Sequence, residues 1–329
     1  MSTTSLRPPK KFGNSSVSKK TEAPDVAALA LDVLCVGHAS FDQVFSVPHH
    51  PLPDEKLFAE GLVLCGGGPA ANAAVQGARL GVRTGFSGYL GTDVFGEAHL
   101  RELLAFGVDV RGVIRGNSPT PLSTVLVKPG GARSLVNFKG ETKALPQDAI
   151  DYRDIQARVL LFDGHEPGLS ESLVTRPVPK VLDAGSLHEG TRRLMGAVDH
   201  LVASEKFARE WLGRDDPSTA LEALSQWAPV VVITLGARGL IWRRDGCEGS
   251  LPAPRVNAVD TTGAGDAFHG AYAAGLATQR PWEELLCLAS VAGAACCEAL
   301  GARPGLPSLE RVETLMSAFV SGDNEGLSC

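Results

Sequence analysis

Short apolar runs alternate along the chain with longer stretches in which small and apolar residues recur at helical spacing. The runs are rich in Val, Leu and Ile, and they lie at residues 31–37, 158–164, 180–185, 200–205 and 229–236. Continuous apolar runs of this length, separated by helices, are typical of a mostly parallel sheet that is covered on both faces. The chain is therefore predicted to fold as one α/β domain, with a long helix over residues 264–278.

Two regions depart from this alternation. Residues 57–64 form an extended stretch, and residues 122–138 contain two alternating stretches on either side of Pro129, Gly130 and Gly131. Alternation of apolar and polar residues around a Pro-Gly-Gly turn is typical of a β-hairpin. We therefore expect a small accessory sheet whose strands lie within about 43–65 and 112–140.

Composition and charge exclude several classes of protein. The 329 residues carry a formal net charge of −6, without the basic surplus of a nucleic-acid-binding domain. The apolar runs are shorter than the roughly 18–20 residues that span a bilayer, so we expect no membrane association. The seven cysteines form no Cys-x-x-Cys pair, and this pattern favours reduced thiols in a cytoplasmic protein.

Both ends of the chain are predicted to lie outside the folded domain, which we place at residues 29–318. Residues 1–28 are basic and rich in Ser and Thr, which predicts a disordered tail. The same bias is compatible with a transit peptide, but the tail lacks the apolar region of a secretory signal. Residues 319–329 are expected to form a flexible C-terminal tail.

Two glycine-rich loops allow more than one interpretation. Gly66, Gly68 and Ala71 match the dinucleotide-binding pattern of an oxidoreductase, and they equally fit a tight turn between a strand and a helix. A Walker A loop is excluded, because the chain contains no Gly-Lys pair. The second loop, residues 234–239 (TLGARG), follows an apolar run and therefore falls where parallel sheets bind their ligands.

The third loop, Asp-Thr-Thr-Gly-Ala-Gly-Asp at residues 260–266, precedes a helix of small residues. Unpaired N–H groups in the first turn of such a helix form a ready anion site. Asp266 in that turn either neutralises the helix dipole or acts as a base beside a bound phosphate. The dipole is expected to depress the pKa of Asp266, which phosphoryl transfer tolerates because proton loss comes late.

Together, the three loops resemble the motifs of the ribokinase (phosphofructokinase B) family of sugar kinases. Residues 260–266 resemble its C-terminal signature, residues 66–81 (GGGPAANAAVQGARLG) resemble its N-terminal signature, and TLGARG lies between them at the expected spacing. The resemblance covers residues 31–312. It implies a ribokinase-like three-layer fold in which the accessory sheet is a lid that closes over the sugar and pairs with a second subunit.

The resemblance also implies roles for particular residues. Asp266 matches the catalytic base, and Gly263, Ala264 and Gly265 match the anion hole for the transferred phosphoryl group. The other matches are sugar-binding residues (Asp42, Gly67, Gly68, Asn72, Asn137 and His165), nucleotide-binding residues (Ser204, Glu205, Thr234, Gly236 and Gly239) and a monovalent-cation site (Asp260 and Thr262).

The implied reaction uses ATP and Mg²⁺, with K⁺ as the candidate monovalent cation, and phosphorylates a primary hydroxyl of a small sugar. The family often carries an Asn-x-x-Glu motif near Mg²⁺ and the phosphates. Here the corresponding stretch is Ser204-Glu205-Lys206-Phe207, so metal handling departs from the family pattern.

The run Gly-Gly-Gly-Pro-Ala-Ala, Asn137 and the triplet at 268–270 (FHG) are most similar to the sulfofructose kinase branch, followed by the ketohexokinases. His165 stands where a sulfonate-binding member is expected to carry Arg. A neutral His anchors a sulfonate poorly, so a plain keto-sugar fits as well. Otherwise His165 is a loop histidine turned to solvent.

Two other functions remain open at this point. A nucleoside kinase uses the same fold, but its nucleobase needs an apolar or aromatic slot that the sequence does not locate. A non-catalytic sugar-binding protein predicts damage to the Gly-Ala-Gly-Asp segment at 263–266, and this segment is intact.

Overall fold

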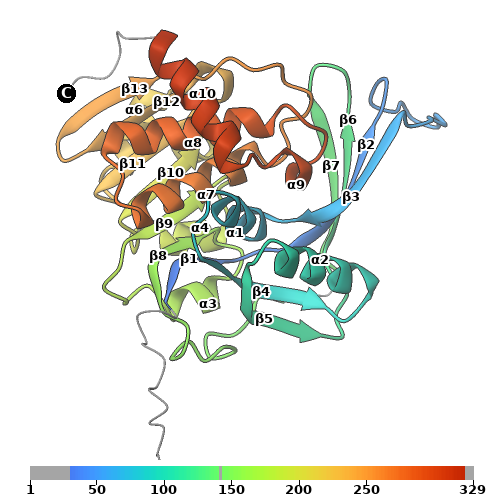
Figure 1. Ribbon diagram of the computed structural model, residues 1–329, viewed down its shortest axis with the longest axis horizontal. Coiled ribbons are helices and arrows are strands. Elements are labelled where there is room, and N and C mark those ends of the chain that lie inside the picture. Colours follow the sequence, from blue (N-terminus) through green and yellow to red (C-terminus); the bar gives the residue numbers. More distant parts are fainter. Residues whose placement is uncertain (1–29, 141–142, 323–329) are drawn as a thin grey trace, which may run out of the picture.

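The predicted apolar runs form parallel strands of a nine-stranded sheet in the computed structural model, which describes residues 30–140 and 143–322 (Figure 1). The strand order is β13-β12-β11-β10-β9-β8-β1-β4-β5, and β12 and β13 are antiparallel to their neighbours. The parallel strands are β1 (Leu31–Val36), β4 (Thr84–Gly91), β5 (Asp109–Gly116), β8 (Ala157–Phe162), β9 (Lys180–Ala184), β10 (His200–Ser204) and β11 (Val230–Thr234). The antiparallel pair is β12 (Leu240–Arg244) and β13 (Cys247–Leu251).

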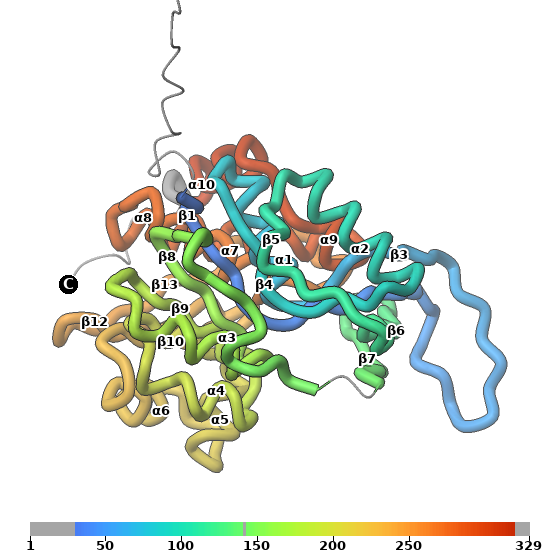
Figure 2. The backbone as a smooth tube through the Cα atoms, turned by 90° about the horizontal axis from the view of Figure 1, so that it is seen from below, coloured from blue at the N-terminus to red at the C-terminus, as the bar shows by residue number. Residues whose placement is uncertain are grey.

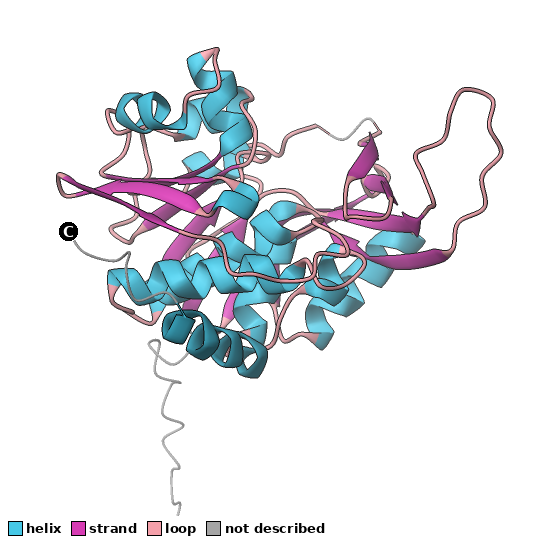
Figure 3. Ribbon diagram, turned by 90° about the horizontal axis from the view of Figure 1, so that it is seen from above, coloured by secondary structure: helices cyan, strands magenta, loops and turns pink. Residues whose placement is uncertain are grey.

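Helices cover both faces of this sheet, which confirms the predicted three-layer architecture (Figure 3). Val159 and Leu161 of β8 pack into one apolar core, while the alternate residues Leu160 and Phe162 pack into the other. The first core is closed by α1 (Pro69–Arg79), α2 (Val94–Ala105), α7 (Ala264–Ala277), α8 (Trp282–Cys296) and α10 (Leu309–Gly322). The second is closed by α3 (Pro167–Glu171), α4 (Glu189–Leu194), α5 (Glu205–Leu212) and α6 (Pro217–Leu224).

A second sheet of four strands forms the lid, and it extends to one side of the main sheet (Figure 2). Its order is β3-β2-β6-β7, with β2 (Ser40–Ser46), β3 (Gly61–Gly67), β6 (Leu122–Val127) and β7 (Arg133–Phe138). The predicted hairpin is therefore the pair β6 and β7. Strand β5, part of which fell within the range predicted for the lid, belongs to the main sheet because it pairs with β4.

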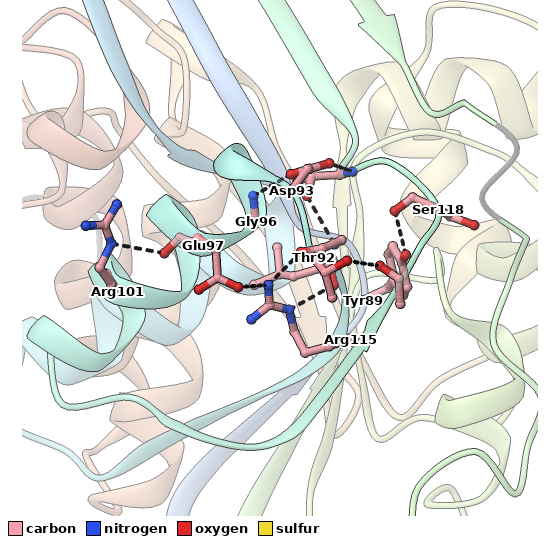
Figure 4. A network of polar contacts seen from close by, with 12 residues as sticks. Tyr89, Thr92, Asp93, Gly96, Glu97, Arg101, Arg115 and Ser118 are labelled. Atoms are coloured by element: carbon pink, nitrogen blue, oxygen red, sulfur yellow. Dashed lines mark hydrogen bonds and ion pairs between the residues drawn. The ribbon is translucent and has the colours of Figure 1, made fainter.

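The connection from β5 to the lid is held by polar contacts at the start of α2 (Figure 4). Asp93 caps α2 and also accepts hydrogen bonds from the backbone N–H and the hydroxyl of Thr120, at 2.7 and 2.8 Å. The Tyr89 hydroxyl donates to the carbonyl oxygen of Ser118 at 2.6 Å. The side chains of Tyr89 and Asp93 therefore hold the segment that leads into β6, and with it the base of the lid, against the end of β4 and the start of α2.

The helix α10 continues to Gly322, past residue 318, where the sequence placed the end of the domain. The predicted basic tail, residues 1–28, and the last residues, 323–329, lie outside the described residues. Within the described ranges, no helix combines the length and the hydrophobicity that crossing a bilayer requires.

Candidate active site

The predicted site residues come from separate parts of the chain, and those of the predicted sugar side meet the first turn of α7 at one edge of the main sheet. The predicted nucleotide residues lie at or just after the ends of β10 and β11. Parallel strands end there, and the first turn of α7 opens at the same edge, beside the buried carboxylates of Asp163 and Asp183. Ligand sites in open α/β sheets lie at this edge. The short helix α9 (Ala302–Gly305) lies behind it, against α1, α8 and β3.

Asp42, Gly67, Gly68 and Asn72 form the predicted sugar side of the site. A Cβ at Gly67 would lie 2.1 Å from the Asp42 carboxylate, and one at Gly68, where φ is +92°, would lie 2.5 Å from the carbonyl oxygen of His38. The two glycines are therefore needed for the close approach of this turn to β2. The turn enters α1 from the lid strand β3, whereas a dinucleotide-binding turn follows a central strand.

Asp266 lies in the first turn of α7 and contacts the sugar side directly. The Asn72 side-chain amide donates to Asp266 Oδ2 at 2.7 Å. Burial raises the pKa of Asp266, and the hydrogen bond from Asn72 and the positive charge of Arg133 offset part of that effect. The expectation of a depressed pKa was wrong, because desolvation outweighs the helix dipole at this position.

The predicted anion hole precedes Asp266. Gly263 has φ +81° and would place a Cβ 2.5 Å from the Cβ of Ala302, so a larger residue does not fit there. A Cβ at Gly265, by contrast, would meet no protein atom within 4 Å. The space that a side chain at residue 265 would enter, beside the first turn of α7, is therefore open.

Asp42 is the second carboxylate of the site, and it is buried in β2. It accepts a hydrogen bond from the Ser40 hydroxyl at 2.8 Å. Burial raises the pKa of Asp42 to about 6; the negative charge of Asp266 adds to the shift, while hydroxyl groups and Arg303 reduce it. Asp42 therefore changes charge near neutral pH.

His165 lies in the loop after β8, and Asp163 fixes the backbone of that loop. The Asp163 carboxylate accepts hydrogen bonds from the backbone N–H groups of His38, Ala70 and His165 at 2.7, 3.2 and 2.8 Å. The His165 ring stacks on that of His188 with a centroid distance of 4.7 Å. His165 is thus held in place rather than turned freely to solvent, and it lines a small pocket together with His38, Lys139 and Glu166.

Asn137 shares a face of the lid sheet with Asp42. The strand register places Asp42 opposite Ser123, and Ser123 opposite Asn137. Laterally paired residues point to the same side of a sheet. Asn137 is exposed, and its position is the outermost of this row.

The predicted nucleotide-binding residues lie in two turns, one after β10 and one after β11. The Ser204 hydroxyl caps α5 by accepting from the Phe207 N–H at 3.0 Å, and Glu205 forms an ion pair with Arg238. Gly236 has φ +60°. Gly239 has φ +92° and would place a Cβ 2.0 Å from a carbonyl oxygen of β13. Thr234 ends β11 at this turn, and its hydroxyl points back to the carbonyl oxygen of residue 203 at 3.4 Å.

Asp260 is fully buried and organises the segment before the anion hole. Its Oδ1 accepts from the backbone N–H and the hydroxyl of Thr262, at 2.9 and 2.7 Å, and its Oδ2 accepts from the Gly301 N–H at 2.8 Å. Both carboxylate oxygens are thus engaged by donors. A monovalent cation at this loop would depend on backbone carbonyl oxygens, whose positions Asp260 fixes.

Sequence reasoning missed two arginines of the site. Arg133 at the start of β7 donates to the Thr261 hydroxyl, so the lid hairpin reaches the loop before the anion hole. Arg303 of α9 is 3% exposed and contacts Asn72. Neither lies in one of the three loops at residues 66–81, 234–239 and 260–266 on which the sequence analysis relied.

The fold and this site define the chain as a ribokinase-like α/β phosphotransferase. It belongs to the pfkB family of carbohydrate kinases, which matches residues 30–309.

Named relatives and solved structures agree with this assignment. The chain is 26% identical to the ribokinase of Haemophilus influenzae over 295 residues, covering 85% of this chain and 96% of the relative. It is 28% identical to fructokinase-1 of Oryza sativa over 295 residues, covering 79% of this chain and 91% of the relative. The structure is similar to that of ribokinase from Thermotoga maritima, with a TM-score of 0.78 and 26% sequence identity. The match covers 87% of this chain and 99% of that ribokinase. It is also similar to Arabidopsis thaliana ribokinase complexed with ribose and ATP, with a TM-score of 0.75 and 26% sequence identity. That match covers 87% of this chain and 99% of the ribokinase.

Proposed function

We propose that this kinase transfers the γ-phosphoryl group of ATP to a primary hydroxyl of a small sugar, with a keto-hexose such as fructose or sulfofructose as the substrate. The observation that carries the proposal is the 2.7 Å contact between Asn72 and Asp266. It joins the predicted sugar side to the open first turn of α7. A hydroxyl held by Asp42 and Asn72 would then lie beside the Asp266 carboxylate and face an anion site.

Asp266 would orient the attacking hydroxyl and accept its proton late in the reaction. Phosphoryl transfer passes through a loose transition state, so positioning and electrostatic stabilisation supply most of the catalysis. The backbone N–H groups of residues 263–265 would stabilise the charge on the transferred group. Arg133, which already reaches this loop from the lid, would add a positive charge when the lid covers the substrates.

The nucleotide and its metal would occupy the opposite side of the site. Among the described residues, no three His, Cys, Asp or Glu side chains gather into a complete metal site. Mg²⁺ bound to ATP takes most of its ligands from phosphates and water, so one carboxylate at the start of α5, that of Glu205, fits this need. Mg²⁺ would neutralise charge that develops on the phosphates.

The sugar specificity is proposed from the pocket beside His165. His38, His165, Lys139 and Glu166 line it, and burial raises the pKa of Glu166 to about 7. These groups offer hydrogen-bond donors and acceptors to several hydroxyls of a sugar. Ribokinases and a fructokinase among the relatives are compatible with a pentose or a hexose.

A homodimer through the lid is proposed from the outer face of the lid sheet. Leu62, Leu64, Val136 and Phe138 are all more than half exposed there. The register places them on the face opposite Asp42. They lie on the two outer strands of the sheet, β3 and β7. Exposed apolar side chains gathered on one face mark an interaction site, and a second copy of the same sheet would cover them. Sedimentation equilibrium with Val136→Lys as the comparison would test this, because the variant should sediment as a monomer.

The assay that tests the reaction is ATP consumption with fructose, sulfofructose, ribose, tagatose and adenosine, each in parallel. We expect turnover with one or more keto-sugars in the presence of Mg²⁺. A preference for adenosine would establish the alternative, a nucleoside kinase. Specific sugar binding without turnover would instead show a non-catalytic sugar-binding protein.

A further inference from the structure

A buried cluster outside the glycine-rich loops connects α9 to the site. Arg303 is 3% exposed, and its guanidinium contacts three side chains. Nε donates to Asn72 Oδ1 at 3.2 Å, Nη1 lies 3.4 Å from Glu102 Oε2, and Nη2 lies 3.1 Å from His99 Nε2. His99 and Glu102 belong to α2, and Asn72 belongs to α1. The cluster therefore joins three helices beneath the predicted sugar side.

The contacts of Asn72 fix the orientation of its amide group. Its oxygen accepts from Arg303, and its NH₂ group donates to Asp266 at 2.7 Å. A guanidinium has donors alone and an ionised carboxylate has acceptors alone. A flipped amide would face donor with donor and acceptor with acceptor, so both neighbours select the same orientation.

We propose that Arg303 is a positioning residue for phosphoryl transfer, which acts by holding the Asn72 amide in the orientation that donates to Asp266. The inference rests on the proposed kinase reaction, in which Asn72 and Asp266 meet the sugar. Arg303 itself does not touch substrate. Its effect reaches the reacting hydroxyl through one side chain.

Glu102 and Gly66 accommodate the buried side chain of Arg303. Glu102 Oε2 also accepts from the backbone N–H of Gly66 at 2.9 Å. A Cβ at Gly66 would lie 2.5 Å from His99 and 3.0 Å from Arg303 Nη2. The glycine that precedes the sugar-binding turn is therefore required by this cluster.

The neighbours of Arg303 in the chain support the other half of the site. The Gly301 N–H donates to Asp260 at 2.8 Å, and Ala302 packs against Gly263 of the anion hole. Residues 301–303 thus hold the anion hole and the Asn72 amide at a fixed separation.

A buried ion pair is weak evidence for a contribution to stability, so a structural role and a positioning role must be separated by experiment. Arg303→Met removes the guanidinium and keeps much of its length. Arg303→Lys keeps the charge but loses the fork that reaches Asn72, Glu102 and His99 together. Arg311→Met is the matched control, because Arg311 forms an ion pair at the surface, with Glu298.

With a sugar that the wild type phosphorylates, Arg303→Met should lower kcat/KM for the sugar by about 10–100-fold, the usual effect of losing a charge-assisted hydrogen bond. The KM for ATP should stay within about twofold of the wild type. In an Asn72→Ala background, Arg303→Met should cost no more than about a further twofold, because residues that act through one another are not additive. Arg303→Lys should recover the Tm and leave kcat low. Full additivity with Asn72→Ala, or a fall in Tm with unchanged kinetics, would overturn the proposal.

A titration of ligand-free protein separates this inference from the proposed function. The carboxyl pKa of Asp266 is followed by ¹³C NMR in the wild type, in Arg303→Met, in Arg303→Lys and in Arg311→Met. Burial has the largest influence on this pKa, followed by Asn72, His269, Arg133 and Asp163. The charges of Asp42, Asp183 and Arg303 also interact with the Asp266 carboxylate. Arg303→Met also removes a positive charge that interacts with Asp266, so its pKa should rise for two reasons. Arg303→Lys keeps the charge but leaves the Asn72 amide held at one end only, so a rise in this variant reports the weakened contact with Asp266, while Arg311→Met should leave the pKa unchanged. An unchanged value in Arg303→Lys overturns the positioning role, even if no sugar is phosphorylated by the wild type.

Discussion

The sugar side and the nucleotide side of this site are built in different ways. On the sugar side, buried side chains from distant segments contact one another, as Asn72 does with Asp266 and Arg303. On the nucleotide side, the residues lie in half-exposed turns, and their contacts include exposed ones such as the ion pair of Glu205 with Arg238. In the proposed function, a sugar would therefore meet side chains whose pKa depends on burial, whereas the nucleotide would meet more exposed turns.

This difference has an energetic consequence. Buried polar groups lose solvation, so each change on the sugar side removes a partner that water cannot replace. Exposed ion pairs, such as that of Glu205 with Arg238, contribute about 0–1 kcal/mol. We therefore expect substitutions on the two sides to differ strongly in effect.

The largest effect is expected for Asp266→Asn, at the junction of the two sides. The change is nearly isosteric, so Tm and ligand affinities should stay close to the wild type, while kcat should fall by ~10²–10⁴. Steady-state kinetics gives the change in kcat, and a melting curve gives the change in Tm. A variant that melts earlier and turns over at the wild-type rate would leave Asp266 as a helix-capping residue only.

Gly265→Ala should separate stability from activity. Its Cβ would meet no protein atom, and Ala favours a helix over Gly by roughly 0.8–1 kcal/mol, so Tm should rise slightly. The methyl group would occupy the proposed phosphate space, and kcat should fall about tenfold or more, as on loss of an oxyanion-type contact.

Gly263→Ala is the matched control for that experiment. Its φ of +81° and the nearby Cβ of Ala302 predict a lower Tm instead. Equal kinetics of Gly265→Ala and the wild type would place the phosphate elsewhere.

The pH dependence should reveal the buried Asp42. Its pKa of about 6 means that kcat/KM for the sugar should be about tenfold lower at pH 5 than at pH 7, because the charged carboxylate binds the hydroxyls. Asp266 interacts with Asp42, so the acidic limb belongs to the pair. An activity that is flat between pH 5 and 7 would contradict a charged Asp42 in sugar binding.

Stability should change in the opposite direction over the same range. The folded state holds the Asp42 proton more tightly than the unfolded chain, so this group stabilises the fold below its ordinary pKa. That contribution is lost as the pH rises to about 6 and stays absent above it. Chemical denaturation of the wild type and of Asp42→Asn between pH 4 and 7 isolates it, since the variant lacks the titration.

The smallest effect is expected for Glu205→Gln on the nucleotide side. The ion pair with Arg238 is partly exposed, so stability should change by about 1 kcal/mol or less. The KM for Mg·ATP should rise a few-fold, at unchanged KM for the sugar, because one carboxylate contributes a minor share of the metal's ligands. A loss as large as that of Asp266→Asn would mean that Glu205 holds the metal more directly than proposed.

The sequence predicted the framework and the glycine turns because both leave local patterns. Apolar runs located the central strands, and the Pro-Gly-Gly turn located the hairpin of β6 and β7. The glycine loops indicated the turns that approach Asp42 and the start of α7, since a Cβ at Gly67, Gly68 or Gly263 would clash there.

The cluster around Arg303 left no such pattern. His99, Glu102 and Arg303 lie on two helices far apart in the chain, and single charged residues on helices usually face solvent. Their burial depends on tertiary packing alone. The raised pKa of Asp266 escaped sequence reasoning for the same reason, because the helix dipole is a local effect and desolvation is not.

The contacts of residues 301–303 also restrict where residues can be inserted into this chain. These three consecutive residues contact Asp260, Gly263 and Asn72, so one inserted residue would shift at least two of these contacts out of register. The connection between β2 and β3, which projects from the lid in Figure 2, carries mostly exposed residues. Doubling a flexible loop costs only about 0.6 kcal/mol. Insertions that reshape the cover of the site can therefore accumulate in that connection, while the segment behind the anion hole keeps a fixed length.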